Sequence, residues 1–276
     1  MPVEDLIRYF NAADRDKEGD SLLYPKGERV EAWHHGLRLS SLFQPIVDLR
    51  SERIVGHRAS LQAERADGSP LDAEVAYALC ETGQSVVRFD RLCRTLHALN
   101  FLAQQRSTGG YLQLAVHPRH LLAVQNQHGL VYEAILKRCG LAPEDIVLEL
   151  AADSLDSSGH FAHALANYRQ RGYRVMLRVS SGNAAAISSL ILQPDAICLS
   201  ERQSTLEAEA RQRNIPVQLE HIDSGAAFRQ AKNDGIELAS GELFGLPAVD
   251  CRPTHRAANP SYNQSNPYGV PHENRQ

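Results

Sequence analysis

The chain has 276 residues, is 43% hydrophobic but only 6% aromatic, and carries a formal net charge of −4. This length allows one large domain or two small ones, and the apolar fraction predicts a core of aliphatic side chains. Proteins that bind DNA or RNA usually present a basic face, so the slightly acidic balance predicts no direct contact with nucleic acid.

The beginning of the chain and its cysteines predict a cytoplasmic location. Residues Met1–Asp5 are acidic and are not followed by the apolar stretch of a signal peptide. No run of about 18 apolar residues is present, so we expect no membrane span. The five cysteines lie far apart without a C-x-x-C pair, which is typical of a reducing compartment and not of a disulfide framework or a zinc knuckle.

In chain order, the sequence predicts three regions. Residues 1–38 are mixed and charged, and we expect a helical and loop extension in which Asp14–Asp20 is an exposed loop between two short helical pieces. Residues 39–250 alternate short apolar runs with amphipathic segments and predict one barrel domain. Residues 251–276 hold four prolines among Asn, Ser and Tyr and predict a disordered tail.

The expected elements of the central region follow from hydrophobic periodicity. The predicted strands are Leu42–Asp48, Ile54–Gln62, Tyr111–Val116, Asp145–Leu150, Arg174–Val179, Ala196–Leu199, Val217–Leu219 and a short piece near Leu243 and Phe244. The predicted helices are Asp72–Cys80, Val86–Gln105, Pro118–Val124, Val131–Cys139, Gly159–Arg171, Ala184–Leu192, Thr205–Arg213 and Gly225–Asn233.

Repeated strand–helix units predict an α/β fold, either a (β/α) barrel or an open doubly wound sheet. A strand count near eight favours the barrel, as does the lack of a glycine-rich phosphate fingerprint after the first strand. Only Arg50–Arg53 separates the first two strands, which is typical of a hairpin. We therefore predict a modified (β/α)8 TIM-type barrel with one antiparallel strand at the start.

Several segments in this order resemble the EAL domain family, the cyclic di-GMP phosphodiesterases. They include Phe43–Leu49, Ile54–Leu61, Leu112–Pro118, Leu148–Leu150 and Gly241–Pro247, and the matching pieces span about Leu42 to Pro247. One spacing departs from the family, because the stretch from Ser200 to Val217 is several residues shorter. The resemblance implies a barrel and a reaction in which two divalent metals, held by acidic side chains, activate a water against a phosphodiester.

The resemblance also implies that most of the family's site positions are changed here. The changed positions are Arg58 for the name-giving glutamate, Ala115 for a metal-binding asparagine, Arg178 and Val179 for paired aspartates, Cys198 for a lysine, Ser240 for a glutamine, and Gln62 and Leu246 for two phosphate-facing arginines. The glutamates at Glu149 and Glu220 are retained, and Asp223 stands for a third glutamate.

Divalent cations such as Mg²⁺ and Mn²⁺ need hard, mostly anionic oxygen ligands. Since acids have been lost and two arginines gained, we predict that Arg58 or Arg178 pairs with Glu149 and turns the metal cluster into an ion-pair cluster. This predicts no metal, no cofactor and no phosphodiesterase activity. Cys198 is interpreted as a small core residue and not as a nucleophile, because no base accompanies it.

Three functions stay open at this point. The favoured one is a catalytically inactive regulatory protein that binds another protein, such as a transcription or signalling factor, by analogy with inactive relatives that regulate motility and biofilm genes. The second is a metal-independent receptor for cyclic di-GMP, whose candidate ligand-binding residues are Gln44, Arg58, Arg178, Asp223 and Phe244. The loss of both phosphate-facing arginines weighs against such binding. The third is a residual phosphodiesterase.

The family's dimer also becomes an open question. The loop that couples the family's active site to its dimer interface is replaced by Ser180–Asn183, followed by three alanines. The sequence therefore leaves the oligomeric state undecided.

Overall fold

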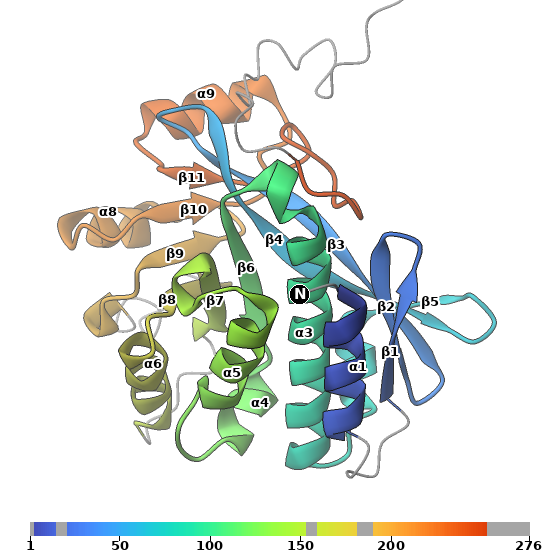
Figure 1. Ribbon diagram of the computed structural model, residues 1–276. Helices are drawn as coiled ribbons and strands as arrows, with labels where there is room; N and C mark the ends of the chain where they lie inside the picture. Colours follow the sequence, from blue (N-terminus) through green and yellow to red (C-terminus); the bar gives the residue numbers. More distant parts are fainter. Residues whose placement is uncertain (1–2, 15–20, 153–158, 181–189, 253–276) are drawn as a thin grey trace, which may run out of the picture.

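Eight strands of the computed structural model close into a barrel (Figure 1). The structure describes residues 3–14, 21–152, 159–180 and 190–252. The barrel strands are β3 (Leu37–Asp48), β4 (Arg53–Arg65), β6 (Tyr111–Val116), β7 (Ile146–Ala151), β8 (Arg174–Val179), β9 (Ala196–Leu199), β10 (Val217–Leu219) and β11 (Leu238–Ala239). The predicted modified TIM-type barrel is confirmed.

Strand β3 runs antiparallel to both of its neighbours, while the other barrel pairings are parallel. It pairs with β4 along its whole length, with Gln44 opposite Arg58, and with β11 through Val47 opposite Ala239. The short connection between β3 and β4 forces this arrangement, because a parallel pair would need a long crossover. The antiparallel start expected from Arg50–Arg53 is therefore confirmed.

Helices cover the outside of the barrel. They are α2 (Ala73–Ala78), α3 (Gly83–Thr108), α4 (Pro118–Ala123), α5 (Leu130–Cys139), α6 (His160–Gln170), α8 (Ser204–Gln212) and α9 (Gly225–Asn233). Asp72 caps α2 by accepting a hydrogen bond from the backbone N–H of Glu74. The main core lies between strands and helices, and a smaller apolar cluster of Val147, Met176, Ala196 and Cys198 is formed by strands β7, β8 and β9.

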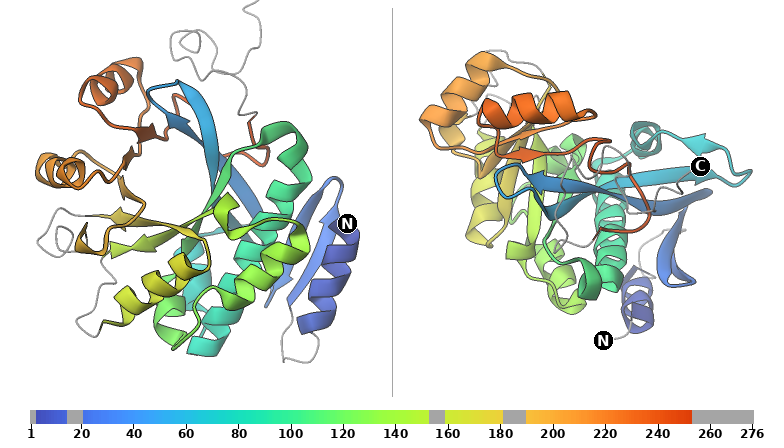
Figure 2. Two further views of the ribbon diagram at one scale, coloured as in Figure 1. Left: turned by 60° about the vertical axis from the view of Figure 1, so that its left-hand side comes forward. Right: turned by 90° about the horizontal axis from the view of Figure 1, so that it is seen from above.

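The N-terminal region differs from its prediction. Helix α1 (Val3–Asp14) is present, but a hairpin of β1 (Ser21–Lys26) and β2 (Arg29–His34) takes the place of the second helical piece. The alternation of polar and apolar residues in this hairpin buries Leu23, Val30 and Ala32 on one face. Figure 2 shows α1 and the hairpin on one side of the molecule, opposite α8 and α9.

The hairpin is also continuous with the barrel sheet, since β2 pairs with β3 over Leu37–Leu39. A domain boundary between residues 38 and 39 would therefore cut through β3. A further short strand, β5 (Pro70–Leu71), pairs with the end of β4.

The last barrel strand lies earlier than predicted. It is formed by β11 and not by Leu243 and Phe244, because the chain turns at Gly241, whose carbonyl accepts the N–H groups of Phe244 and Gly245. A Cβ at Gly241 would lie 2.4 Å from the backbone N and O of Ile222, so the close approach that permits this turn requires glycine.

Four predictions fall wholly or partly outside the described residues. They are the exposed loop at Asp14–Asp20, the tail at 251–276, the loop Ser180–Asn183 with its three alanines, and the helix Ala184–Leu192, of which the structure describes only a 3-10 turn at Leu190–Leu192. Among the described helices, none combines the length and the apolar character that crossing a membrane requires.

Candidate functional site

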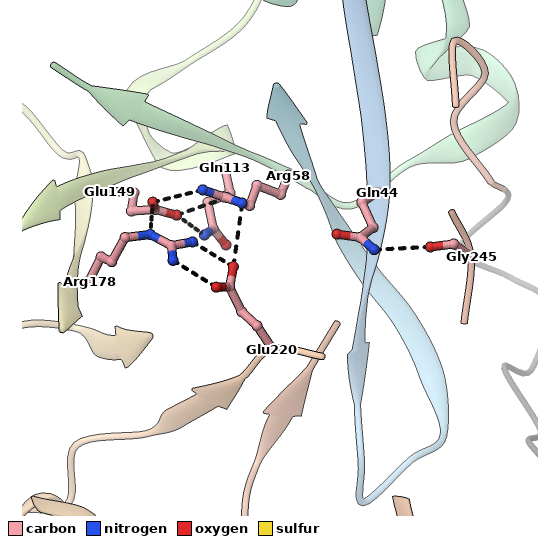
Figure 3. Close-up of polar contacts among 7 residues, drawn as sticks. All are labelled: Gln44, Arg58, Gln113, Glu149, Arg178, Glu220 and Gly245. Atoms are coloured by element: carbon pink, nitrogen blue, oxygen red, sulfur yellow. Dashed lines mark hydrogen bonds and ion pairs between the residues drawn. The ribbon is translucent and has the colours of Figure 1, made fainter. Parts of the chain in front are cut away.

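Four charged side chains meet at the carboxyl ends of the barrel strands (Figure 3). Arg58 comes from β4, Glu149 from β7 and Arg178 from β8, and Glu220 directly follows β10. Side chains alternate between the two faces of a strand, and these positions all face inward. In TIM-type barrels the functional site is built at this end, so the cluster occupies the place where chemistry is expected.

Arg58 lies between the two carboxylates. Its Nε is 3.1 Å from Oε2 of Glu149 and its Nη2 is 3.1 Å from Oε1 of the same residue. Its Nη1 is 3.4 Å from Oε1 of Glu220. The side chain of Glu149 is only 3% exposed and that of Glu220 8%, so this pairing occurs where water is largely excluded.

Arg178, on β8, bridges the same two carboxylates. Its Nε donates to Oε1 of Glu149 at 2.5 Å, while Nη1 and Nη2 donate to the two oxygens of Glu220 at 2.7 and 2.5 Å. The expected pairing of an arginine with Glu149 is therefore confirmed, and both arginines take part. Two cations and two anions form a cluster with no net charge, which we call the ion-pair cluster (Arg58, Glu149, Arg178, Glu220).

The ion-pair cluster sets the protonation of its most buried member. Burial alone would raise the pKa of Glu149, but the guanidinium groups of Arg58 and Arg178, with the amide of Gln113, lower that pKa to about 2. The fully buried Gln113 donates from Nε2 to Oε2 of Glu149 at 2.6 Å. Glu149 is therefore a carboxylate at neutral pH whose oxygens already accept hydrogen bonds from three side chains.

The donor set of this site does not fit a divalent metal. Both carboxylates are bound by guanidinium groups, and Ala115, which lies opposite Glu149 in the sheet, offers no ligand atom. Burial raises the pKa of Cys198 well above its ordinary value, so its sulfur is a protonated thiol. Within the ranges that the structure describes, no three His, Cys, Asp or Glu side chains are grouped so that they could hold a metal ion.

Three other predicted site residues have burial or local backbone contacts of their own. Val179 is buried in the main core, on the face of β8 opposite to Arg178. Ser240 is buried, and its backbone bonds to Ile222 and Leu219. The Asp223 carboxylate accepts the N–H of Glu242 and so caps the turn that follows β11.

Two candidate ligand-binding residues make contacts that involve the closing segment of the chain. Gln44 donates from Nε2 to the carbonyl of Gly245 at 3.1 Å and lies apart from the ion-pair cluster (Figure 3). Phe244 was expected to contact a ligand, but its ring is buried and packs edge-on against Phe228 of α9, with ring centroids 6.1 Å apart. The structure thus gives Phe244 a packing role.

Gln113 is the site residue that the sequence analysis missed. It interrupts the apolar run of β6 and lies two positions before Ala115, so the period of a strand places both on the inner face. A polar residue within this apolar run indicates a side chain with a polar partner inside the barrel. A cavity of about 320 Å³ lies beside the cluster and is lined by residues of β4, β6, α2 and α3. Because these residues come from separate parts of the chain, no single sequence segment predicts the cavity.

Comparison with known proteins extends these observations. The sequence model of the EAL domain matches residues 29–247. No curated protein sequence matches the chain. Solved structures of EAL proteins also match the chain.

The chain shares 18% identity with a standalone EAL protein from Vibrio cholerae, solved in its c-di-GMP bound form, with a TM-score of 0.64 and coverage of 78% of this chain and 94% of that one. It shares 14% with Bacillus subtilis YkuI, solved with c-di-GMP and calcium, with a TM-score of 0.68 and coverage of 82% and 60%. It shares 18% identity with Klebsiella pneumoniae BlrP1, solved with calcium and cy-diGMP, with a TM-score of 0.63. The match covers 76% of this chain and 56% of BlrP1, so the chain spans little more than half of BlrP1. Such identities show a shared fold.

Proposed function

The chain belongs to the EAL domain family, and we propose that it is a catalytically inactive member that regulates by binding another protein. The observation that carries the proposal is the ion-pair cluster. In it, Arg58 and Arg178 bind both retained glutamates at the end of the barrel where the family's site is expected. A metal would have to displace two guanidinium groups from carboxylates that are at least 92% buried, and would gain only two acidic ligands.

A turnover assay tests the catalytic part of the proposal. The protein is incubated with cyclic di-GMP and Mg²⁺ or Mn²⁺, next to an active EAL phosphodiesterase under the same conditions. We expect no linear dinucleotide from this protein. Metal-dependent product that disappears in the Glu149→Gln variant would overturn the proposal.

Exposed apolar side chains support the protein-binding part. Val75 and Leu79 at α2 are 46% and 59% exposed, and Leu122 of α4 is 49% exposed. These helices lie side by side, because Arg119 of α4 donates to the carbonyls of Tyr77 and Cys80 at the end of α2. Neighbouring exposed apolar residues are typical of surfaces that bind proteins.

Affinity purification from native lysate followed by mass spectrometry tests this part. The unchanged protein is compared with a Leu79→Ser, Leu122→Ser variant whose unfolding temperature is checked first. We expect a stoichiometric partner that the variant loses. Recovery of no such partner would count against the proposal.

The second candidate is a metal-independent receptor for cyclic di-GMP. It is favoured by one observation, namely that two EAL structures sharing this fold were solved with c-di-GMP. Against it, the arginines of the ion-pair cluster already bind carboxylates and would have to exchange them for phosphate. Calorimetry with cyclic di-GMP, with and without Mg²⁺, separates the two candidates, since a receptor would bind equally in both conditions.

A further inference from the structure

The cavity beside the ion-pair cluster has the character of a small-molecule site. Its volume of about 320 Å³ is at the lower end of the range for ligand pockets. One side is formed by Arg58, Glu149 and Arg178, and the rest is mostly apolar, with Leu61 and Tyr77 among its lining residues. Two polar side chains of α3 also line it, and each has a hydrogen-bond donor for which the described residues provide no acceptor.

The first donor is His97, whose tautomer is fixed by a chain of hydrogen bonds. The amide of Asn100 uses both of its hydrogens, one on the carbonyl of Val30 at 2.8 Å and one on Oγ of Ser41 at 3.2 Å. The hydroxyl hydrogen of Ser41 is then available for Nδ1 of His97 at 2.8 Å, which makes Nδ1 an acceptor.

Burial lowers the pKa of His97 to about 4, although Asp90 opposes this effect, so the ring is neutral at pH 7. Its single proton therefore resides on Nε2. The side chain is 6% exposed, and among the described residues nothing accepts a hydrogen bond from Nε2. Asn100 and Ser41 thus hold a buried N–H donor in the wall of the cavity.

The second donor is Arg94, which precedes His97 by three residues and so lies on the same face of α3. Its Nε and Nη2 bind Oδ2 of Asp90 at 2.8 and 2.6 Å, and the side chain is 3% exposed. The hydrogen bonds of Arg94 within the described residues use Nε and Nη2, and Nη1 is not among the fully buried atoms left without a partner, so Nη1 is open to the cavity. Two directed donors that are open to one cavity can bind an acceptor from outside the protein.

We propose that this cavity binds a small apolar molecule with one carboxylate, which accepts hydrogen bonds from His97 Nε2 and Arg94 Nη1. A carboxylate is the fitting group because it only accepts, and because a guanidinium group binds it strongly. The apolar body would lie against Leu61 and Tyr77. The negative charges of Glu149 and Glu220 neutralise the positive charges of Arg58 and Arg178. The preference for a carboxylate over a neutral ligand therefore depends on the donors of His97 and Arg94. This binding goes beyond the proposed function and does not depend on it.

Fluorine NMR titration of the full chain tests the proposal with two probes of equal size, 4-fluorobenzoate and the neutral 4-fluorobenzyl alcohol. We expect 4-fluorobenzoate to bind with a Kd of about 10 µM to 1 mM, which suits a ligand of this size. We expect the alcohol to bind at least tenfold more weakly. No binding of the benzoate, or equal binding of both probes, would overturn the proposal.

Two variants locate the site. Ala115 lines the cavity and has an exposed side chain, so Ala115→Leu fills the cavity without disturbing the core and should weaken benzoate binding at least tenfold. The control Ala208→Leu, at an exposed alanine of α8, should leave it unchanged. His97→Phe keeps the ring but removes the Nε2 donor, and should weaken the benzoate and not the alcohol. Unchanged benzoate binding in Ala115→Leu would overturn the proposal even if His97→Phe fails to fold.

Discussion

Arg58 holds Glu149 by two parallel hydrogen bonds, with Nε 3.1 Å from Oε2 and Nη2 3.1 Å from Oε1. This fork-shaped pairing matches the planar guanidinium group to both carboxylate oxygens and orients each side chain. The arginine thereby supplies the positive charge that a buried carboxylate needs. Glu149 can be retained as a structural residue, and its presence alone is no indication of metal binding.

Removal of one charge from the ion-pair cluster should destabilise the protein strongly. The Glu149→Gln variant leaves two partly buried guanidinium groups with only Glu220, and breaking a buried pair costs about 3–5 kcal/mol of unfolding free energy. Urea unfolding at pH 7 measures the loss. The control Glu52→Gln breaks the Glu52–Lys232 pair, whose side chains are 30% and 41% exposed, and should cost less than about 1 kcal/mol. Equal losses in both variants would contradict this prediction.

The contribution of Glu149 should depend on pH in a defined window. Its pKa falls from the ordinary value of 4.5 to about 2 in the folded protein. A carboxyl group whose pKa is lowered by folding stabilises the protein above the unfolded value and loses this contribution as the pH falls towards the folded value. At about 1.4 kcal/mol per pH unit, the contribution is about 3 kcal/mol.

Urea unfolding of the unchanged protein and the Glu149→Gln variant, repeated from pH 7 down to pH 3, checks this expectation. The difference between their unfolding free energies should be constant above pH 4.5 and should shrink below it. A difference that stays constant down to pH 3 would show that the carboxylate form of Glu149 is not what the arginines stabilise.

Restoring acids at the two arginine positions should restore a response to metal. The combined substitution Arg58→Glu, Arg178→Asp would place four carboxylates together, which lowers stability through repulsion until a cation binds. We expect its Tm to rise by several degrees with millimolar MnCl2, while the Tm of the unchanged protein stays constant. The combination Arg58→Gln, Arg178→Gln is the matched control and should respond less. An equal rise in the Tm of the unchanged protein would contradict our conclusion that its site residues do not fit a divalent metal.

The turn after β11 should not tolerate a side chain. In the Gly241→Ala variant the new Cβ would lie 2.4 Å from backbone atoms of Ile222, and backbone cannot move aside as a flexible side chain can. We expect a loss of at least about 3 kcal/mol in unfolding free energy, at the upper end of overpacking effects. Gly68→Ala, where no atom lies within 4 Å of the new Cβ, should cost only about 1–2 kcal/mol from its positive φ. Similar losses would argue against the close contact.

The barrel could be predicted well wherever local periodicity was strong. Strands β6, β8, β9 and β10 and helix α9 have the bounds expected from the sequence. The hairpin β1–β2 was missed because its strands are half-buried and charged, although Gly27 at a positive φ marks its turn. The place of β11 could not be predicted, since it depends on how closely Gly241 approaches Ile222, which follows the neighbouring strand β10.

The candidate site could be predicted as far as residue types allowed. The loss of acids and the gain of Arg58 and Arg178 predicted an ion pair with Glu149, but not that each arginine would bridge Glu149 and Glu220. The packing of Phe244 against Phe228 could not be predicted, because a residue in a glycine-rich segment gives no indication of burial. The tautomer of His97 depends on Ser41 and Asn100, residues brought to it by tertiary packing, so no pattern within α3 could reveal it.

The reversed direction of β3 decides how the chain is connected to its barrel. A first strand parallel to the others would begin at the end of the barrel opposite the site, whereas β3 begins at the site end, beside the hairpin β1–β2. The segment after β11 reaches the same end, where Asp250 pairs with Arg29. Within the described residues, the chain therefore enters and leaves the barrel on one face. The turn between β3 and β4 lies at the opposite end, so both described connections of the barrel to its flanking segments leave that end uncovered by β1, β2 and Asp250.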